Sequence, residues 1–184
     1  MIRTFLALDL SQLFAEEIKV ALPALYRYVE KARWVKPEQI HLTLHFFGST
    51  LEEDLPRIYE LISSVTNACP LLSLELSEIG FFPNAKKPRV LWLGVKGDTE
   101  LLIARQKTLE TQLSEAGFPV GARDFKPHAT LARTRPGGMC ISGSKLPVFG
   151  SSRKKVTEWV LFKSTLTSQG SIYEILKRFP LCKS

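Results

Sequence analysis

The 184-residue sequence predicts an α+β fold in which two pseudo-symmetric lobes surround a central cleft. Short apolar runs typical of strands alternate with longer segments whose apolar residues recur at helical spacing. The chain also matches itself: a shift of 87 residues places one strand–helix–strand order on another. With 45% apolar and 23% charged residues, the chain can bury a core, so disorder is excluded as its main state. We expect a single two-lobed domain over residues 1–184.

The first half of the chain is expected to contain two strands and two helices. They are a strand over 2–10, a helix over 11–30, a strand over 40–47 closed by Gly48, and a helix over 51–68. Ser11 suits the N-cap of the first helix because its hydroxyl can accept a hydrogen bond from a backbone N–H. Pro23 predicts a kink in the same helix, since proline lacks the N–H that the helix needs.

The second half repeats this alternation. Strands are expected over 71–82 and 89–96, then a helix from Asp98 or Thr99 to Gly117, then strands over 127–134, 156–165 and 171–179. Residues 136–150 are predicted to form a long loop. In the self-alignment, residues 2–10 match 89–97 and residues 41–44 match 128–131, which would place corresponding strands beside one cleft.

A short motif, His-x-Thr-Leu, occurs at residues 41–44 and again at 128–131. From the composition, two such copies would arise by chance in roughly 3 of 10,000 sequences. Alternate residues of a strand share a face, so His41 stands beside Thr43, and His128 stands beside Thr130. Each copy therefore presents one imidazole and one hydroxyl from a rigid element.

These side chains suit a displacement at phosphorus that needs no metal. One imidazole can accept the proton of the attacking oxygen while the other donates a proton to the departing oxygen, and each transfer typically contributes about 10² to 10⁴ in rate. In-line attack needs the acid and the base on opposite sides of phosphorus, so one histidine from each lobe is expected. The hydroxyls of Thr43 and Thr130 can donate to the non-bridging oxygens. We expect His41, Thr43, His128 and Thr130 to be catalytic, with no metal and no cofactor.

At these residues the chain resembles the 2H phosphoesterases, and within them the RNA 2′,3′-cyclic phosphodiesterases, also called 2′-5′ RNA ligases. The resemblance covers nearly the whole chain and is carried by Arg3-Thr4-Phe5-Leu6-Ala7-Leu8-Asp9, Trp34-Val35, residues 41–48, 88–94, 125–133 and 164–173, and Phe179-Pro180-Leu181. It implies lobes of antiparallel sheet with outer helices. It also implies metal-free hydrolysis of an RNA 2′,3′-cyclic phosphate to the 2′-phosphomonoester, and an ATP-independent reverse reaction in which an RNA 5′-hydroxyl attacks the cyclic phosphate. By the resemblance His41 is the proton donor and His128 the acceptor, an assignment that the residues alone leave open.

The net charge of +7 is concentrated in one basic segment, residues 117–155. That segment holds eight basic residues against Asp124 alone, namely Arg123, Lys126, Arg133, Arg135, Lys145, Arg153, Lys154 and Lys155. Localised positive charge attracts phosphate-rich partners, so RNA with a 2′,3′-cyclic phosphate end, or a related nucleotide, is the expected partner. No apolar run approaches the ~18 residues of a membrane helix, and three widely spaced cysteines indicate a reducing cytoplasm. A monomer without membrane contact is expected.

Arg133, Phe47 and Arg89 are further candidates for substrate binding. Phe47 falls on the histidine face under strict alternation and could stack on a base. Arg133 falls on the apolar face unless the strand ends or bulges before it. His45 shares the face of His41, where we interpret it as a neighbour of the site. The two histidines cannot chelate one zinc ion, because on a strand they lie nearly 14 Å apart at a rise of ~3.4 Å per residue.

The glycine-rich stretch from Gly138 to Gly143, followed by Ser144-Lys145, resembles a phosphate-binding loop. The lysine comes one place late, however, and Pro147 prevents the helix that such a loop needs, so ATP binding is rejected. Rival functions stay open: a ligase or a hydrolase of small cyclic nucleotides that uses the same four residues, or a non-catalytic RNA-binding module that uses the basic segment.

Overall fold

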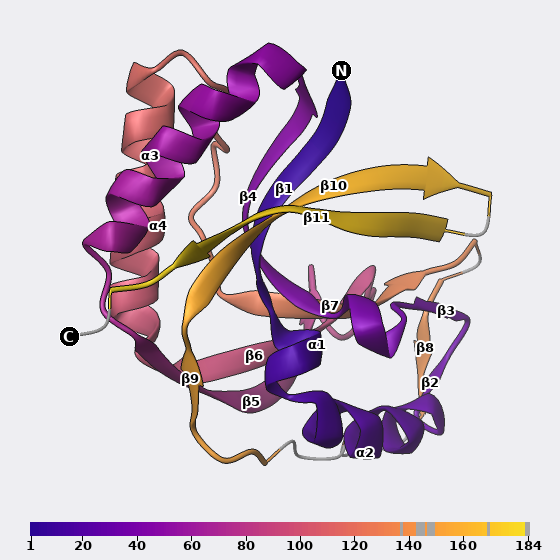
Figure 1. Cartoon of the computed structure of the whole chain (residues 1–184). Coiled ribbons are helices and arrows are strands. Elements are labelled where there is room, and N and C mark those ends of the chain that lie inside the picture. The colour runs from indigo at the N-terminus through magenta and orange to yellow at the C-terminus, as the bar shows by residue number, and fades with distance from the viewer. Residues whose placement is uncertain (137, 143–145, 147–149, 169, 183–184) are drawn as a thin grey trace.

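The computed structural model describes residues 1–136, 138–142, 146, 150–168 and 170–182 (Figure 1). Its helices are α1 (Leu10–Leu13), α2 (Ala15–Tyr26), α3 (Leu55–Asn67) and α4 (Thr99–Glu115), with 3₁₀ turns η1 (Pro37–Gln39) and η2 (Glu52–Asp54). Its strands are β1 (Ile2–Asp9), β2 (Val29–Glu30), β3 (Ala32–Trp34), β4 (His41–Thr50), β5 (Leu72–Phe82), β6 (Val90–Gly97), β7 (His128–Thr134), β8 (Cys140–Ile141), β9 (Lys154–Val156), β10 (Glu158–Thr167) and β11 (Gly170–Pro180).

Most of the strands form one curled antiparallel sheet in the order β11-β10-β1-β4-β7-β6-β5-β9, with β3 paired to β7. The two halves of this order meet where β4 pairs with β7, at Leu42 and Ala129. On either side of that junction the arrangement repeats: β1 flanks β4 as β6 flanks β7, and β10 and β5 come next. The two-lobed α+β fold expected from the sequence is therefore confirmed, and its lobes are related through the pairing of the two motif strands.

The strand register corrects the internal alignment in one detail. β4 and β7 correspond at the expected shift of 87 residues, since Leu42 faces Ala129 in the middle of both motifs. The flanking strands do not, because Asp9 pairs with His41 whereas Gly94 pairs with His128, so β1 and β6 correspond at a shift of 85 residues. The paired positions Asp9 and His41 are 32 residues apart along the chain, whereas Gly94 and His128 are 34 apart, so an ungapped alignment cannot match both strands of each pair.

Both motif strands carry a β-bulge immediately after the motif threonine. In β4 the partner of Ala7 is Thr43 and the partner of Leu6 is His45, which leaves Leu44 as the extra residue. In β7 the register skips Leu131 in the same way. A bulge shifts the alternation of side chains by one residue. The residues directly beyond each bulge therefore point to the face opposite to the one that strict alternation predicts; in β4 a second register shift then skips Phe47.

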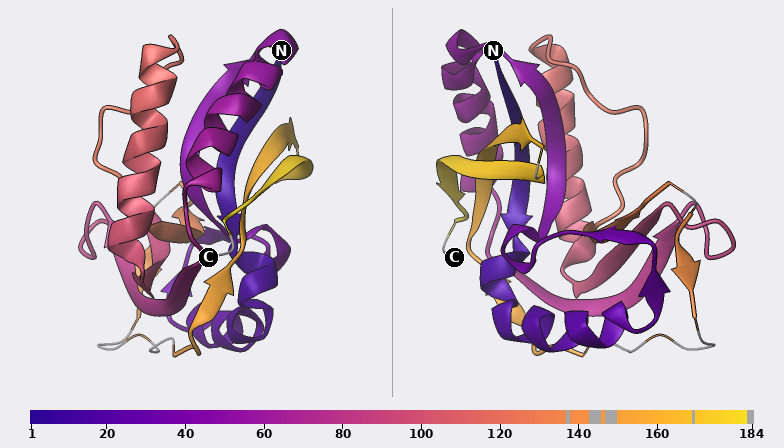
Figure 2. Two further views of the ribbon diagram at one scale, coloured as in Figure 1. Left: turned by 60° about the vertical axis from the view of Figure 1, so that its left-hand side comes forward. Right: turned by 90° about the vertical axis from the view of Figure 1, so that its right-hand side faces the viewer.

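The helices cover the outside of the sheet and help to bury a continuous apolar core. α3 and α4 pack side by side next to β4, and α1 and α2 lie at the other end of the molecule (Figure 2). The expected first helix is divided at Phe14 rather than kinked at Pro23, which α2 accommodates. Asp9, and not Ser11, caps α1, because its carboxylate accepts from the backbone N–H of Gln12.

Two more expectations differ from the structure. The strand expected over 156–165 corresponds to β10, which begins two residues later, while Val156 ends the separate short strand β9, and the loop expected over 136–150 contains the short strand β8. Residues Gly143, Ser144 and Lys145, on which the rejected phosphate-loop interpretation depended, lie outside the described residues. Among the helices of the described part of the chain, none is long and apolar enough to cross a membrane.

Candidate active site

A pocket of about 560 Å³ lies where the two lobes meet, and side chains from both lobes line it. His41 and Thr43 enter it from β4, and His128 and Thr130 enter it from β7. All four are half-buried, so each imidazole and hydroxyl is held by the sheet yet reachable from the pocket. The structure thus brings together the four residues that the motif repeat singled out.

The two imidazoles are oriented by equivalent hydrogen bonds. His41 Nδ1 lies 2.6 Å from the backbone carbonyl of Gln39, and His128 Nδ1 lies 2.6 Å from that of Lys126. A carbonyl only accepts, so each Nδ1 carries the proton and donates it. In both rings the Nε2 atom is therefore the one left to exchange a proton with a bound molecule.

The antiparallel register arranges the four side chains crosswise. Because Leu42 faces Ala129, continuing the pairing by one residue in each direction sets His41 opposite Thr130 and Thr43 opposite His128. The two histidines thus occupy opposite corners of the group, and a hydroxyl lies beside each of them. A tetrahedral group placed in the middle would meet an imidazole on two opposing sides.

Aromatic rings enclose His41. The Phe5 ring centroid is 4.8 Å from that of His41, and Tyr173 meets the imidazole edge-on at 5.4 Å. Burial lowers the pKa of His41 below its ordinary value of 6.5, and the positive charge of Arg133 lowers it further. The Gln39 carbonyl and the Asp9 carboxylate act in the opposite direction but do not reverse the shift.

His128 is supported from behind by Phe82 and Trp92. Phe82 packs edge-on against the imidazole at 5.0 Å, Trp92 lies at 6.3 Å, and the two aromatic rings stack on each other. The Trp92 indole lies directly over the backbone of Gly80, where any Cβ would overlap its six-membered ring. Glycine at position 80 is therefore what allows Trp92 to reach the position from which it supports His128.

The bulges decide which neighbours of the motifs reach the pocket. Phe47, predicted on the histidine face, is instead buried in the core, and Phe46 lines the pocket with 61% of its surface exposed. The same shift in β7 brings Arg133 to the pocket, as the bulged alternative required. Phe46 and Arg133 hold equivalent positions in the two lobes, each two residues beyond the bulge.

The structure places the other two candidates differently. Arg89 comes just before β6, where its backbone is hydrogen-bonded to Phe82 and Thr134, and its exposed side chain does not line the pocket. His45 is buried in the pocket wall, with Nδ1 3.6 Å from a Glu110 carboxylate oxygen. Burial lowers the pKa of His45, although Glu110 and the Pro119 backbone oppose the shift.

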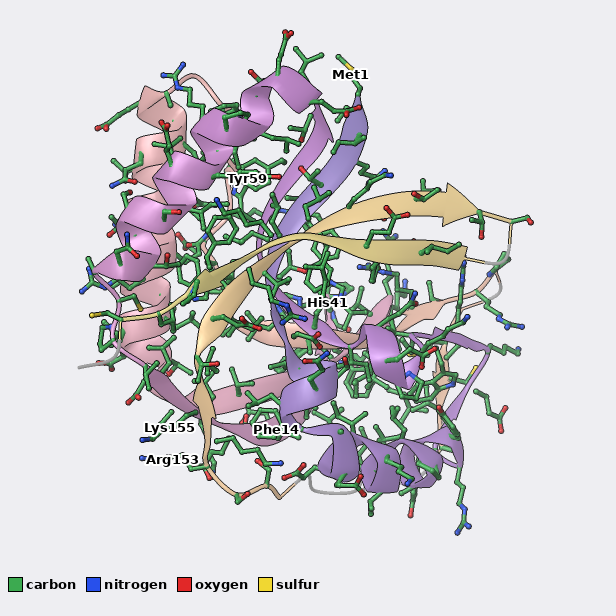
Figure 3. All side chains as sticks on the ribbon, viewed as in Figure 1. Met1, Phe14, His41, Tyr59, Arg153 and Lys155 are labelled. Atoms are coloured by element: carbon green, nitrogen blue, oxygen red, sulfur yellow. The ribbon has the colours of Figure 1, made fainter. Side chains whose placement is uncertain are left out.

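Positive charge around the pocket comes from three arginines, Arg3, Arg123 and Arg133. Within the described residues none of the three forms a salt bridge, and Glu110 is the acidic residue among the lining side chains. The end of the basic segment lies elsewhere: Arg153 and Lys155 are at the β9 end, away from His41 (Figure 3).

Ion pairs already occupy part of that end of the segment. Arg153 pairs with Glu75, and Lys154 pairs with Glu17 at 2.8 Å. Lys145 lies outside the described residues. The basic segment is therefore divided between the pocket and a remote surface, and the segment as a whole does not face the motif histidines.

A family model described as LigT like Phosphoesterase matches the chain twice, over residues 13–92 and 93–173, so each match contains one His-x-Thr motif. The chain belongs to this phosphoesterase family. An RNA 2′,3′-cyclic phosphodiesterase of Archaeoglobus fulgidus is 35% identical over 96% of this chain and 99% of its own. A crystal structure of a Thermus thermophilus protein superposes with a TM-score of 0.80 at 28% identity over 100% of both chains. The E. coli LigT structure complexed with 3′-AMP gives a TM-score of 0.80 at 28% identity over 98% of each chain.

Sequence reasoning missed several residues of this LigT-like pocket. Tyr173 arrives from β11, far along the chain, and Gln106 and Glu110 arrive from α4. No local pattern marks them, since each reaches the pocket through tertiary packing alone. Phe46 could have been found from the burial alternation only if the bulge at Leu44 had been recognised.

Proposed function

We propose that this LigT-like phosphoesterase hydrolyses RNA 2′,3′-cyclic phosphate ends to 2′-phosphomonoesters, without a metal, by acid and base catalysis from two histidines. The observation that carries the proposal is the pair of equivalent Nδ1–carbonyl hydrogen bonds, which leave His41 Nε2 and His128 Nε2 free in one pocket. Because one histidine comes from each half, the proposal treats residues 1–184 as one catalytic domain with two lobes.

The reaction begins with a water molecule on the His128 side of the cyclic phosphate. As the water oxygen attacks phosphorus, His128 Nε2 takes the water proton. The bond between phosphorus and O3′ breaks on the opposite side, and His41 Nε2–H gives its proton to O3′. The products are a 2′-phosphomonoester and a free 3′-hydroxyl, and the two histidines have exchanged protonation states. The assignment of donor and acceptor follows the family resemblance.

The remaining pocket side chains stabilise charge on the phosphate. The hydroxyls of Thr43 and Thr130 lie beside the imidazoles and donate to the non-bridging oxygens, whose negative charge grows in the transition state. Arg133 adds a guanidinium in the same pocket and, in the described part of the chain, no carboxylate pairs with it. The imidazoles themselves supply acid and base, so the mechanism requires no metal-bound hydroxide.

The shape and charge of the pocket favour an RNA end as the substrate. Arg3 and Arg123 also line it, so positive charge extends past the motif side chains. Phe46 offers an exposed aromatic face for a base. An RNA 5′-hydroxyl bound in place of the water would give a 2′–5′ linkage by the same proton transfers.

The test uses a short RNA that ends in a 2′,3′-cyclic phosphate, incubated with the protein in EDTA, and identifies the position of the phosphate in the product. We expect a 2′-phosphate, turnover that survives chelation, and losses of about 10³-fold or more in His41→Ala and His128→Ala. Thr130→Val should lower kcat by about 10- to 1,000-fold, whereas the matched variant Thr134→Val, on the same strand outside the pocket, should not.

Each alternative predicts a different result. Turnover that EDTA abolishes and one divalent ion restores would contradict the metal-free mechanism. RNA binding without turnover would indicate that the protein is a non-catalytic RNA-binding module. A 2′–5′ linked RNA as the main product would favour the ligase. Full activity on a mononucleoside cyclic phosphate together with none on RNA would favour a hydrolase of small cyclic nucleotides.

A further inference from the structure

Gln106 is a buried polar residue in the middle of an apolar helix face. Only 3% of its surface is exposed, while Leu102, Leu109 and Leu113 on the same face of α4 are completely buried. Burying an amide among leucines is costly unless its hydrogen bonds are satisfied. A leucine at this position would continue the apolar stripe, so helix packing alone does not explain the glutamine.

The partner of Gln106 is the backbone at the β4 bulge. Its Nε2 donates to the carbonyl of Leu44 at 3.1 Å. Leu44 has no partner residue on β1, where the register skips it, nor on β7, whose pairing with β4 is at Leu42 and Ala129. The Gln106 side chain therefore supplies the donor that a neighbouring strand supplies elsewhere.

The second lobe satisfies the equivalent carbonyl by another route. Leu131 is the bulge residue of β7, and its carbonyl accepts from the backbone N–H of Val35, just beyond β3, at 2.8 Å. Both bulges are thus held by a donor from outside the β1–β4 or β6–β7 pair. In β7 that donor is backbone, and in β4 it is one replaceable side chain.

The β4 bulge lies between two parts of the pocket. Thr43 precedes it and Phe46 follows it, and the bulge is the reason that Phe46, and not Phe47, turns toward the pocket. One turn further along α4, Glu110 approaches His45, the residue after Leu44, so the helix contacts the bulge at two successive positions.

We propose that Gln106 is a positioning residue of this site: its hydrogen bond to the Leu44 carbonyl fixes the β4 bulge and thereby the placement of Thr43 and Phe46. Gln106 acts through β4 and not on the substrate. Its effect on turnover rests on the proposed function, whereas its effect on the β4 backbone does not.

The first variant is Gln106→Leu, which keeps the side-chain volume and removes the donor. We expect kcat on a mononucleoside 2′,3′-cyclic phosphate to fall by about 10- to 100-fold, because displacements near 1 Å at a reacting centre have costs of this order. Backbone amide exchange across residues 43–46 should become faster. Gln112→Leu is the matched control, since Gln112 also lies on α4 and its side chain accepts a hydrogen bond from Ser64, away from β4.

The second variant, Gln106→Glu, tests the donor itself. A carboxylate cannot donate to the Leu44 carbonyl, but the protonated acid can, and burial raises the pKa of such a group. The ratio of kcat for Gln106→Glu to that for Gln106→Leu should therefore rise as the pH is lowered. In protein that stays folded at every pH measured, a role limited to core packing would not produce this dependence.

The outcomes separate the two proposals. Wild-type kcat together with unchanged amide exchange in Gln106→Leu overturns the positioning role, and so does a ratio that is constant with pH. If the wild-type protein does not turn over cyclic phosphates, the proposed function fails, and amide exchange at residues 43–46 then decides the positioning role alone. Faster exchange there in Gln106→Leu, with none in Gln112→Leu, supports it.

Discussion

Substituting Gly80 by alanine should lower kcat by displacing the aromatic rings that support His128, without changing any motif residue. A Cβ at position 80 would lie 2.5 Å from Cη2 of the Trp92 indole and closer still to two other atoms of the same ring. Ordinary contact begins near 3.4 Å. The indole must therefore retreat by roughly 1 Å or more, or the β5 backbone must move by a similar amount.

The displacement reaches His128 by two contacts. Trp92 meets the imidazole at 6.3 Å and also stacks on Phe82, which itself packs against His128 at 5.0 Å. Overpacking of this kind costs about 1–3 kcal/mol in the free energy of unfolding. A shift of about 1 Å at a reacting group lowers kcat by up to about 100-fold.

Steady-state kinetics on a mononucleoside 2′,3′-cyclic phosphate and urea unfolding of the same samples measure the two effects. Gly150→Ala is the control, because a Cβ there meets no heavy atom of the described residues within 4 Å. Adding Trp92→Phe should recover part of the kcat lost in Gly80→Ala, since the smaller ring removes the overlapping atoms. A folded Gly80→Ala protein with wild-type kcat would refute the reasoning.

Three further results are expected. Asp9→Asn removes a negative charge near His41 and should lower the pKa of His41 further. The limb of the kcat/KM–pH profile that reports His41 should therefore move to lower pH, and a profile in which neither limb moves would contradict this. Burial holds the pKa of His45 below its unfolded value of 6.5, so the unfolded state binds more protons and the free energy of unfolding falls as the pH drops below about 6.5. In urea titrations between pH 7 and 5, His45→Gln should show a weaker pH dependence than the wild-type protein. Lys154→Met should cost about 1 kcal/mol in the free energy of unfolding through loss of the ion pair with Glu17, yet leave KM for RNA unchanged at low salt. A raised KM would indicate that Lys154 helps to bind RNA.

The strongly patterned elements were predictable because local periodicity sets them. The strands at 2–9, 72–82 and 90–97 and the helix at 99–115 lie within one residue or two of expectation. The first helix was not predicted correctly. Asp9 caps α1 and Phe14 separates α1 from α2, whereas Pro23 fits within α2. Which capping side chain is used depends on the path of the preceding strand, and the sequence does not state that path.

The motif repeat, by itself, determined the identity of the four central side chains and the two-lobed plan, because a spacing of two residues on a strand fixes a shared face whatever surrounds it. The tertiary structure alone decided what stands next to them. The bulge at Leu44 adds one residue to the strand without any recognisable sequence motif, and it places Phe46, and not the predicted Phe47, at the pocket. Likewise, contacts between distant segments bring Tyr173 and Gln106 to the site. Those contacts are set by the packing of whole elements, which no local window of sequence contains.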